Sequence, residues 1–152
     1  MIGQGKGLVM AGVYEQAEKL VAAASIASSE LNNCTMHLFS NNYIPSGKDT
    51  IASFTEAAFS GYANATIATW GTPFYDGAGN AKTVATSVEF TQNGGNITDV
   101  AYGYWLQSGN STILGAQRFT DAPIAFNGAG NSVVVLAEVT LALSLDCVEV
   151  DS

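Results

Sequence analysis

Apolar and polar residues alternate with a period of two over much of the chain beyond residue 63, which is typical of half-buried β-strands. The clearest run is residues 131–146, NSVVVLAEVTLALSLD. One set of alternate positions is entirely apolar, whereas the set between them is mixed. We therefore predict one long strand that is able to bend. Its apolar face carries Val133, Val135, Ala137, Val139, Leu141, Leu143 and Leu145.

Two further runs have the same period. Residues 82–91 alternate and end at the Asn-Gly-Gly-Asn sequence of residues 93–96. Residues 99–107 alternate and meet Ser-Gly-Asn-Ser at 108–111. Because a Gly-Asn pair suits a tight type I′ or II′ turn, residues 112–120 are expected to return as an antiparallel strand. One face of the first run carries Val84, Thr86, Val88 and Phe90.

Shorter strands are predicted at residues 35–39, 64–71 and 73–76. With the longer runs they make about seven strands, separated by turn residues. This organisation predicts a mainly β fold, either an antiparallel β-sandwich or a jelly-roll-like barrel. We expect a single body over residues 35–152.

The first 34 residues follow a different pattern and are predicted to form an N-terminal arm and an Ala-rich segment. Residues 1–12 contain four glycines and no sustained period, so in isolation they favour a flexible arm. From Val13 to Leu31 apolar residues recur at near-helical spacing, which predicts a helix. Because its apolar face is thin and rich in alanine, an extended arm that becomes ordered on a partner stays an alternative.

Residues 38–63, LFSNNYIPSGKDTIASFTEAAFSGYA, fit neither a helix nor a strand pattern for long. The segment predicts the end of a strand at Phe39, a turn around Pro45, and a short helical piece at residues 50–59. Thr50 or Asp49 is the expected cap of that piece. Its aromatic residues are expected to plug one end of the sandwich: Phe54, Phe59 and Tyr62, with Tyr43 nearby.

Composition and charge narrow the class of protein. Charged residues make up 12% of the chain against 47% hydrophobic, so neutral polar groups must cover the surface. This balance is commoner in β-rich extracellular or virion proteins than in cytosolic enzymes. The net charge is −8 and the five cations are scattered, so we expect no binding to nucleic acid or to an anionic membrane. Residues 20–29 are too short to span a bilayer and poor as a signal peptide, so synthesis in the cytoplasm is expected.

Residues that carry chemistry are scarce. His37 is the only histidine, and a hydrogen-bonded strand histidine is favoured over a catalytic base. A zinc site needs more Cys and His ligands than the chain has, and the acids are dispersed. We therefore predict no catalytic residue, no metal, no cofactor and no enzymatic activity. For Cys34 and Cys147, two buried thiols are favoured over a disulfide.

Residues within 38–63, and some beyond them, resemble a family of small structural proteins encoded beside capsid genes in tailed bacteriophages, cyanobacterial phages being one group where such a protein is expected. The resemblance covers roughly residues 38–145. The residues that carry it are Leu38-Phe39, Asn41-Asn42-Tyr43, Pro45, Phe54-Thr55-Glu56-Ala57, Phe59, Gly61, Tyr62, Tyr102-Gly103-Tyr104 and Gln117-Arg118-Phe119.

This resemblance implies a capsid cement, or decoration, protein, which binds the outer face of the major capsid shell and is commonly trimeric. The implied partners are the major capsid protein and further copies of the chain, and the implied location is the capsid exterior of the virion. On this hypothesis residues 1–31 reach onto a neighbouring subunit or the capsid. The predicted partner-interface residues are Ile2, Leu8, Val9, Met10, Tyr14 and Tyr43.

Three alternatives stay open. A receptor- or glycan-binding fibre or spike module of a phage would use Trp70 and Trp105 as stacking platforms, although core packing is favoured for both. A polysaccharide-acting enzyme would need two of the dispersed acids to meet in the fold. A secreted bacterial adhesin would be exported, and a bridge between Cys34 and Cys147 would suit it.

Overall fold

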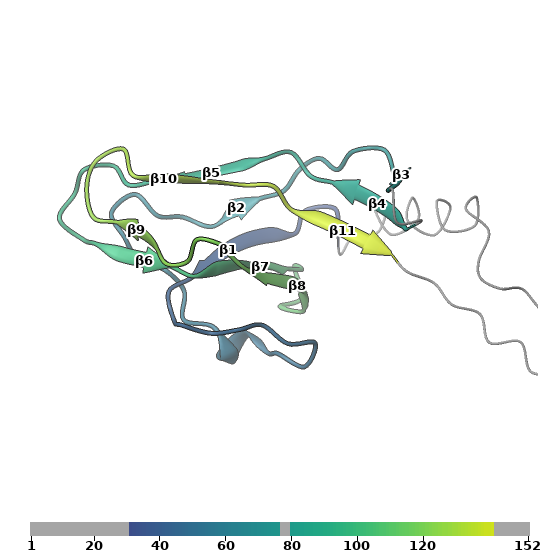
Figure 1. Cartoon of the computed structure of the whole chain (residues 1–152), viewed down its shortest axis with the longest axis horizontal. Helices are drawn as coiled ribbons and strands as arrows, with labels where there is room; N and C mark the ends of the chain where they lie inside the picture. Colours follow the sequence, from purple (N-terminus) through teal and green to yellow (C-terminus); the bar gives the residue numbers. More distant parts are fainter. Residues whose placement is uncertain (1–30, 77–79, 142–152) are drawn as a thin grey trace, which may run out of the picture.

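The computed structural model describes residues 31–76 and 80–141. Within these ranges the chain is mainly β, as predicted, and its strands pair antiparallel (Figure 1). The predicted N-terminal helix and five of the predicted interface residues, Ile2, Leu8, Val9, Met10 and Tyr14, lie outside the described residues. The strands are β1 Thr35–Phe39, β2 Ala65–Thr66, β3 Phe74–Tyr75, β4 Ala81–Val84, β5 Val88–Thr91, β6 Asp99–Ala101, β7 Gly103–Gln107, β8 Ile113–Arg118, β9 Ile124–Phe126, β10 Ser132–Val135 and β11 Glu138–Leu141.

The largest sheet has the strand order β2-β1-β7-β8. In β1 every residue except Thr35 is buried, and β7 is buried from Gly103 to Leu106. Both strands are thus covered on both faces, which a pattern of simple alternation does not predict. The register places Met36 opposite Leu106 and Leu38 opposite Tyr104.

The predicted antiparallel return after residue 111 is confirmed, because β8 pairs with β7. The predicted type I′ or II′ turn is wrong. Both of those turns need a positive φ at Gly109, but the positive φ, 63°, lies at Ser111. The loop instead closes through the Ser111 amide on the Ser108 carbonyl, at 3.0 Å, and the Ser108 amide on the Thr112 carbonyl, at 2.9 Å. This wider loop accompanies a shift of register between Leu106 and Gln107.

The remaining strands form the pair β10-β5, the sheet β11-β4-β3 and the pair β6-β9. The long strand predicted at 131–146 is divided into β10 and β11 by Leu136 and Ala137. At this break the Ala137 carbonyl accepts a 2.9 Å hydrogen bond from the amide of Ala85 instead of continuing the β10 ladder. The predicted inward face is confirmed at Val135 and Ala137, which are buried, and at Val133 and Val139, which pack against the core. Leu143 and Leu145 lie outside the described residues.

The single strand predicted at 82–91 is also divided, into β4 and β5, and half of its predicted face is wrong. Thr83 and Ala85 are buried in the first half, whereas Phe90 is buried in the second. The phase reverses at Thr86 and Ser87, two consecutive exposed residues. In the same way the run 99–107 is divided at Tyr102, whose amide donates to the Phe39 carbonyl at 2.8 Å and whose carbonyl accepts from Phe119 at 2.9 Å.

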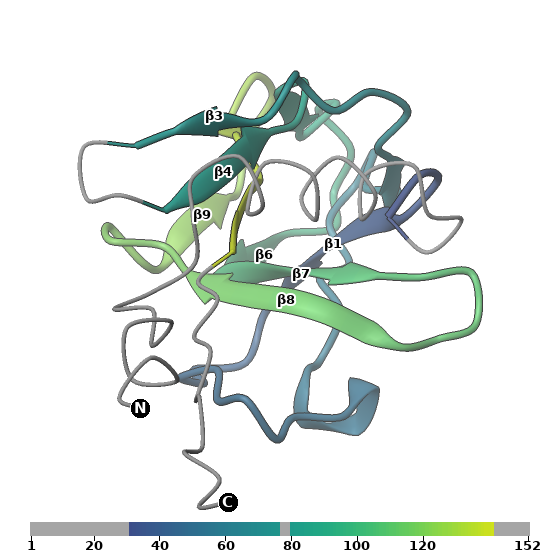
Figure 2. The same ribbon diagram turned by 90° about the vertical axis from the view of Figure 1, so that its right-hand side faces the viewer.

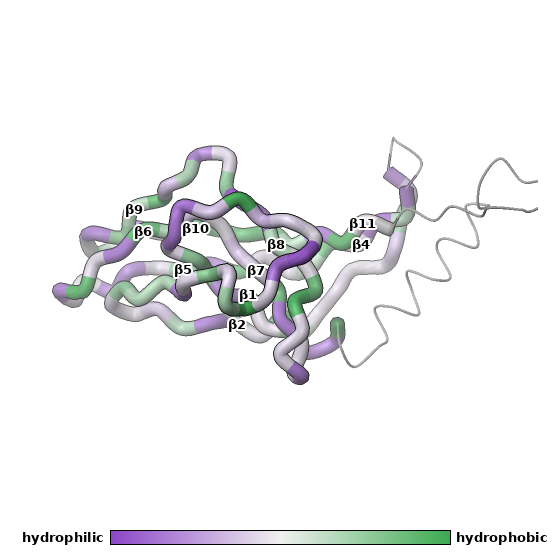
Figure 3. Tube along the Cα trace, turned by 90° about the horizontal axis from the view of Figure 1, so that it is seen from below, coloured by the Kyte–Doolittle hydropathy of each residue, from purple (hydrophilic) through white to green (hydrophobic). Residues whose placement is uncertain are grey.

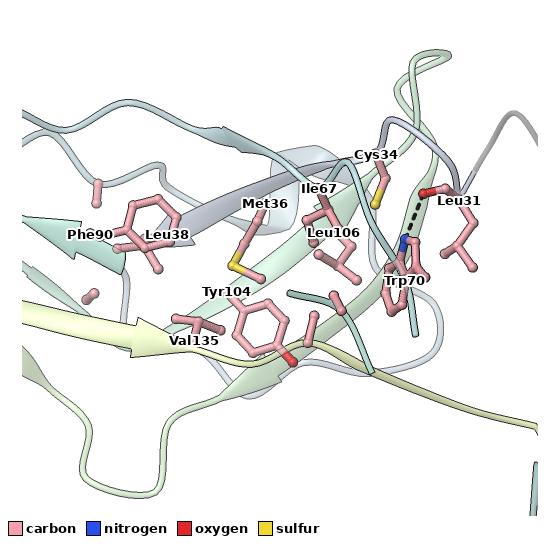
Figure 4. Close-up of a cluster of buried hydrophobic side chains, with 14 of the residues drawn as sticks. Leu31, Cys34, Met36, Leu38, Ile67, Trp70, Phe90, Tyr104, Leu106 and Val135 are labelled. Carbon is pink, nitrogen blue, oxygen red and sulfur yellow. Dashed lines mark hydrogen bonds between the residues drawn. The ribbon is translucent and has the colours of Figure 1, made fainter. Parts of the chain in front are cut away.

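The sheets enclose one main core. Figure 4 shows its centre, where Met36 and Leu38 of β1 and Tyr104 and Leu106 of β7 meet Val135 of β10. Hydrophobic segments are interrupted by hydrophilic ones along the described part of the trace (Figure 3). The fully buried members of the core are Cys34, Met36, Leu38, Ala101, Phe126 and Ala137. Among the described residues no helix has the length and apolarity needed to cross a bilayer.

Candidate functional site

Residues 40–57, which we call the cover, cross the face of β1 and β7 that points away from the main core. They run below the sheet in both Figure 1 and Figure 2. The cover contains the 3₁₀ turn η1, Ile51–Ser53, preceded by Thr50 as its cap. The longer helical piece predicted at 50–59 is wrong. From Phe54 the backbone is extended, because it pairs with the end of β1: the amide of Ala57 donates to the Leu38 carbonyl at 2.9 Å.

Aromatic rings fill the space between the cover and the sheet. Phe54, from the cover, stacks on Trp105 of β7 with ring centroids 5.1 Å apart and planes 11° apart. It also touches Phe39 of β1 at 5.1 Å and the edge of the Tyr43 ring at 5.7 Å. Gly103 leaves room for this packing, since a Cβ there would lie 2.5 Å from the Phe39 ring and 2.2 Å from a backbone oxygen.

Side-chain hydrogen bonds fasten the two ends of the cover together. Asn41 accepts from the Thr55 amide at 2.9 Å and donates to the Ser53 carbonyl at 3.0 Å, so one amide group closes the loop. Within the loop Asp49 accepts the hydroxyl of Tyr43 and the amide of Ser46. The hydrogen bond from Tyr43 is the main cause that lowers the pKa of Asp49, and the same bond raises the pKa of Tyr43.

Arg118 of β8 holds the cover from the sheet side. Its guanidinium donates to the Tyr43 carbonyl at 3.1 Å and lies over the Tyr102 ring, 4.9 Å from the centroid. Tyr43, the described member of the predicted interface residues, is therefore half-buried and bonded within the protein.

A polar chain ties the cover to β1. His37 Nδ1 lies 2.7 Å from Glu56 Oε1, and His37 Nε2 lies 2.8 Å from Thr35 Oγ1. Glu56 Oε1 also accepts the hydroxyl of Tyr62 at 2.8 Å, and that hydroxyl accepts the amide of Leu38 at 3.1 Å. Burial is the main cause that raises the pKa of the Tyr62 hydroxyl.

A hydroxyl, an imidazole and a carboxylate in this order also form the relay of serine hydrolases. Here His37 is 7% exposed and stacked on Trp105 with centroids 4.6 Å apart. Thr35 and His37 are neighbours on one face of one strand, and every ring nitrogen and the hydroxyl has an internal partner. The arrangement fits the predicted hydrogen-bonded strand histidine and fastens Glu56 of the cover to the sheet.

The outer surface of the cover carries the side chains that are free to meet a partner. Ile44 is 76% exposed and Lys48 is exposed, although both lie next to residues of the fastened loop. Ile44 is not among the interface residues predicted from the sequence. An isoleucine placed before a proline in a polar turn is the signal that would have singled it out, because burial does not require it there.

Both tryptophans are buried, Trp70 at 9% exposure and Trp105 at 2%. Trp70 Nε1 donates to the Leu31 carbonyl at 3.1 Å (Figure 4), and Trp105 Nε1 donates to the Gln107 side chain at 3.1 Å. The alternative in which these rings are glycan-stacking platforms is therefore wrong, and core packing is confirmed for both. Cys34 is a buried free thiol whose pKa is raised by burial.

Within residues 31–76 and 80–141 no three side chains of His, Cys, Asp or Glu lie close enough to share a metal ion. The site is thus a fastened loop with an exposed outer surface. Comparison of the chain with protein-family models, with curated proteins and with solved structures found no match.

Proposed function

We propose that the protein is a structural, non-enzymatic virion protein: a cement, or decoration, protein that binds the outer face of a tailed-phage capsid and ties neighbouring capsid subunits together. In this proposal its partners are the major capsid protein and other copies of the chain, as a homotrimer. The β-sheets form a sandwich or jelly-roll-like body, and the protein is made in the host cytoplasm.

The observation that carries the proposal is that the residues carrying the resemblance to the phage family make contacts inside the protein that hold the cover in place. Asn41 closes the cover, Glu56 and Tyr62 bond it to β1, and Gly103 receives the ring of Phe39. These residues act within the protein and leave an ordered outer loop exposed. A protein that reinforces a shell needs an ordered surface and large contacts, and it needs no turnover.

The N-terminal residues supply the second part of the proposal. Residues 1–30 are long enough to reach well beyond the body, since an extended chain spans about 3.3 Å per residue. An arm that becomes ordered on a partner buries more area per residue than a rigid surface does. We therefore assign capsid attachment to Ile2, Leu8, Val9, Met10 and Tyr14.

Capsid shells assembled from the candidate major capsid protein test this function. The purified full chain is expected to sediment with the shells in a fixed ratio to the capsid protein, and to raise the temperature at which the shells come apart. Absence of sedimentation, or binding that leaves the shells no more stable, would contradict the cement function.

The arm is tested separately by deleting residues 2–12, with circular dichroism to check the fold. A matched control replaces the same residues by a Gly/Ser sequence of equal length, which keeps the length and removes the apolar side chains. Both variants are expected to keep the fold and to bind shells at least tenfold more weakly, a loss of about 1.4 kcal/mol. Full binding by either variant would show that the apolar side chains of residues 2–12 do not contribute to the contact with the capsid.

A further inference from the structure

Large apolar side chains that stay exposed on a folded protein often mark contact surfaces. Two pairs of them lie on two separate faces of this molecule. The exposed large apolar residues of the described part are Ile44, Phe74, Ile97, Leu114, Val134 and Leu136.

The first face, which we call the basic face, consists of Ile44, Lys48 and Leu114. Ile44 and Lys48 belong to the cover, and Leu114 lies on β8 at the edge of the largest sheet. A hollow joins the two parts, and it is lined by Pro45, Ser46, Gly47 and Asp49 of the cover and by residues 113–116 of β8. The cover and β8 therefore form one continuous surface.

Lys48 gives this face its charge. Of the three cations in the described part, Lys82 pairs with Glu138 at 2.7 Å and Arg118 lies over the Tyr102 ring. Lys48 is exposed and has no ion pair within this part of the chain. The neighbouring Asp49 keeps its negative charge, but its carboxylate already accepts hydrogen bonds from Tyr43 and Ser46, so Lys48 is the charged group of this face that has no partner among the described residues.

The basic face is also held in shape before any partner arrives. Asn41 closes the loop that carries Ile44, and Arg118 donates to the carbonyl of the preceding residue, Tyr43. A surface that is already ordered loses little conformational entropy on binding, which favours a stable contact.

The second face, which we call the acidic face, consists of Glu89, Val134 and Leu136. Val134 and Glu89 are direct cross-strand neighbours in the β10-β5 pair, so their side chains lie on the same side of it. Val134 is 61% exposed and Leu136 is 50% exposed, while Val135 between them is buried in the core. Glu89 is exposed and makes no ion pair with the described residues.

The cover and the β10-β5 pair lie on opposite sides of the largest sheet. In Figure 1 the β10-β5 pair runs along the top, and the cover hangs below the largest sheet at the bottom. One copy therefore cannot bring its own two faces together.

We propose that the basic face of one copy of this chain docks on the acidic face of a second copy. Each face offers two exposed apolar side chains beside one free charge, and the two charges are opposite. A contact between unlike faces can pair Lys48 with Glu89, whereas a contact between two acidic faces leaves both Glu89 side chains without a cation. The two unpaired charges therefore favour the head-to-tail arrangement.

A head-to-tail contact leaves one face of each kind free at the ends of a pair. It therefore repeats, and it closes into a ring when the rotation between successive copies allows. The inference rests on the proposed structural role, because it names the surfaces through which copies of a shell protein associate.

Charge reversal tests the contact on the full chain, with sedimentation velocity over a range of concentrations. Lys48→Glu and Glu89→Lys are each expected to raise the dissociation constant of self-association about tenfold or more. The double variant restores the opposite charges and is expected to return to within about threefold of the original protein. Added salt is expected to weaken the original contact, because the charged pair is exposed.

Apolar substitutions give the matched control. Ile44→Ser and Val134→Ser are expected to weaken association, whereas Ile97→Ser is expected to leave it unchanged, because Ile97 is 62% exposed but belongs to neither face. A chain that stays monomeric at every concentration overturns the inference. So does a double variant that associates no better than the single ones.

Binding of the same variants to capsid shells separates this inference from the proposed function. Charge-dependent self-association without shell binding supports the contact and contradicts the cement function. Shell binding by a monomeric protein, with loss of binding in Lys48→Glu, supports the cement function. In that case the basic face belongs to the capsid contact, and the inference is overturned.

Discussion

The two sides of β1 and β7 are buried in different ways. On the inner side Met36, Leu38 and Leu106 join a core to which most of the described strands contribute. On the outer side Phe39 and Trp105 are covered by Phe54 from a single segment. The inner core thus depends on contacts between distant parts of the chain, whereas the outer cluster depends on one loop and its hydrogen bonds. We infer that the core sets global stability and that the cover is able to open locally.

The largest effect is expected from breaking the inner side. Phe126 is fully buried and stacks on Phe59, with ring centroids 3.9 Å apart and planes 3° apart. Phe126→Ala leaves a cavity in the core, and is expected to lower the free energy of unfolding by about 4 kcal/mol. Urea denaturation measures this change. A loss below about 1 kcal/mol would show that the site collapses and that the core is not tightly packed.

Breaking the outer side is expected to cost less and to act locally. Phe54→Ala removes the ring that contacts Phe39 and Trp105, for an expected loss of about 3 kcal/mol or less. Hydrogen exchange distinguishes the two sides. In Phe54→Ala, the amides of Ser40, Thr55 and Ala57 are expected to exchange faster than in the original protein, because their hydrogen bonds hold the cover closed. The ladder between β1 and β7 is expected to stay protected, and equal acceleration in both regions would contradict local opening.

The inner side is also the part that the sequence predicts best. Alternation at residues 131–146 identified the inward positions Val133, Val135, Ala137 and Val139, because every second residue of this run is apolar. Alternation failed at residues 82–91, where Thr83, Ala85, Thr86 and Ser87 are small or neutral and do not mark a phase. At the point where the buried face changes, Ala85 forms a β-bridge with Trp70. These residues are distant in the sequence, so the pattern within residues 82–91 does not reveal the contact.

The outer side was visible in the sequence only as an aromatic segment without a period. Its position follows from pairings far apart in the chain, such as His37 with Glu56 and Arg118 with the Tyr43 carbonyl. The predicted helical piece at 50–59 does not continue beyond Ser53, because the backbone from Phe54 onward pairs with the end of β1. Ile44 is exposed in a turn that has no hydrophobic period, so no periodic pattern marks it, whereas the predicted interface residue Tyr43 is bonded inside the protein.

Gly61 offers a smaller test at the point where the segment leaves the cover and joins the core. Its φ is +91°, and an added Cβ would lie 3.0 Å from the side chain of Asn93. Gly61→Ala is expected to lower the free energy of unfolding by about 1–2 kcal/mol, through backbone strain and the contact with Asn93. Gly47→Ala is the matched control, because nothing lies within 4 Å of a Cβ there. Thermal denaturation of the two variants should separate them, and equal stability would contradict the strain.

Tyr62 links the two sides, and its removal is expected to have the smallest effect at neutral pH. Its ring packs on Phe59 and Phe90, and its hydroxyl joins Leu38 to Glu56. Tyr62→Phe keeps the ring and loses both hydrogen bonds, for an expected cost of about 1 kcal/mol.

The pH dependence of this variant tests whether the Tyr62 hydroxyl is buried at the junction. Because burial raises the pKa of Tyr62 above its ordinary value of 10.0, the folded state favours the neutral hydroxyl. This contribution to stability is complete below pH 10 and is lost as the pH rises further, since the unfolded chain ionises first. Urea denaturation between pH 8 and pH 11 is therefore expected to show a steeper loss in the original protein than in Tyr62→Phe. If stability falls equally with pH in both proteins, the Tyr62 hydroxyl is exposed to solvent. In that case it does not link the cover to the core.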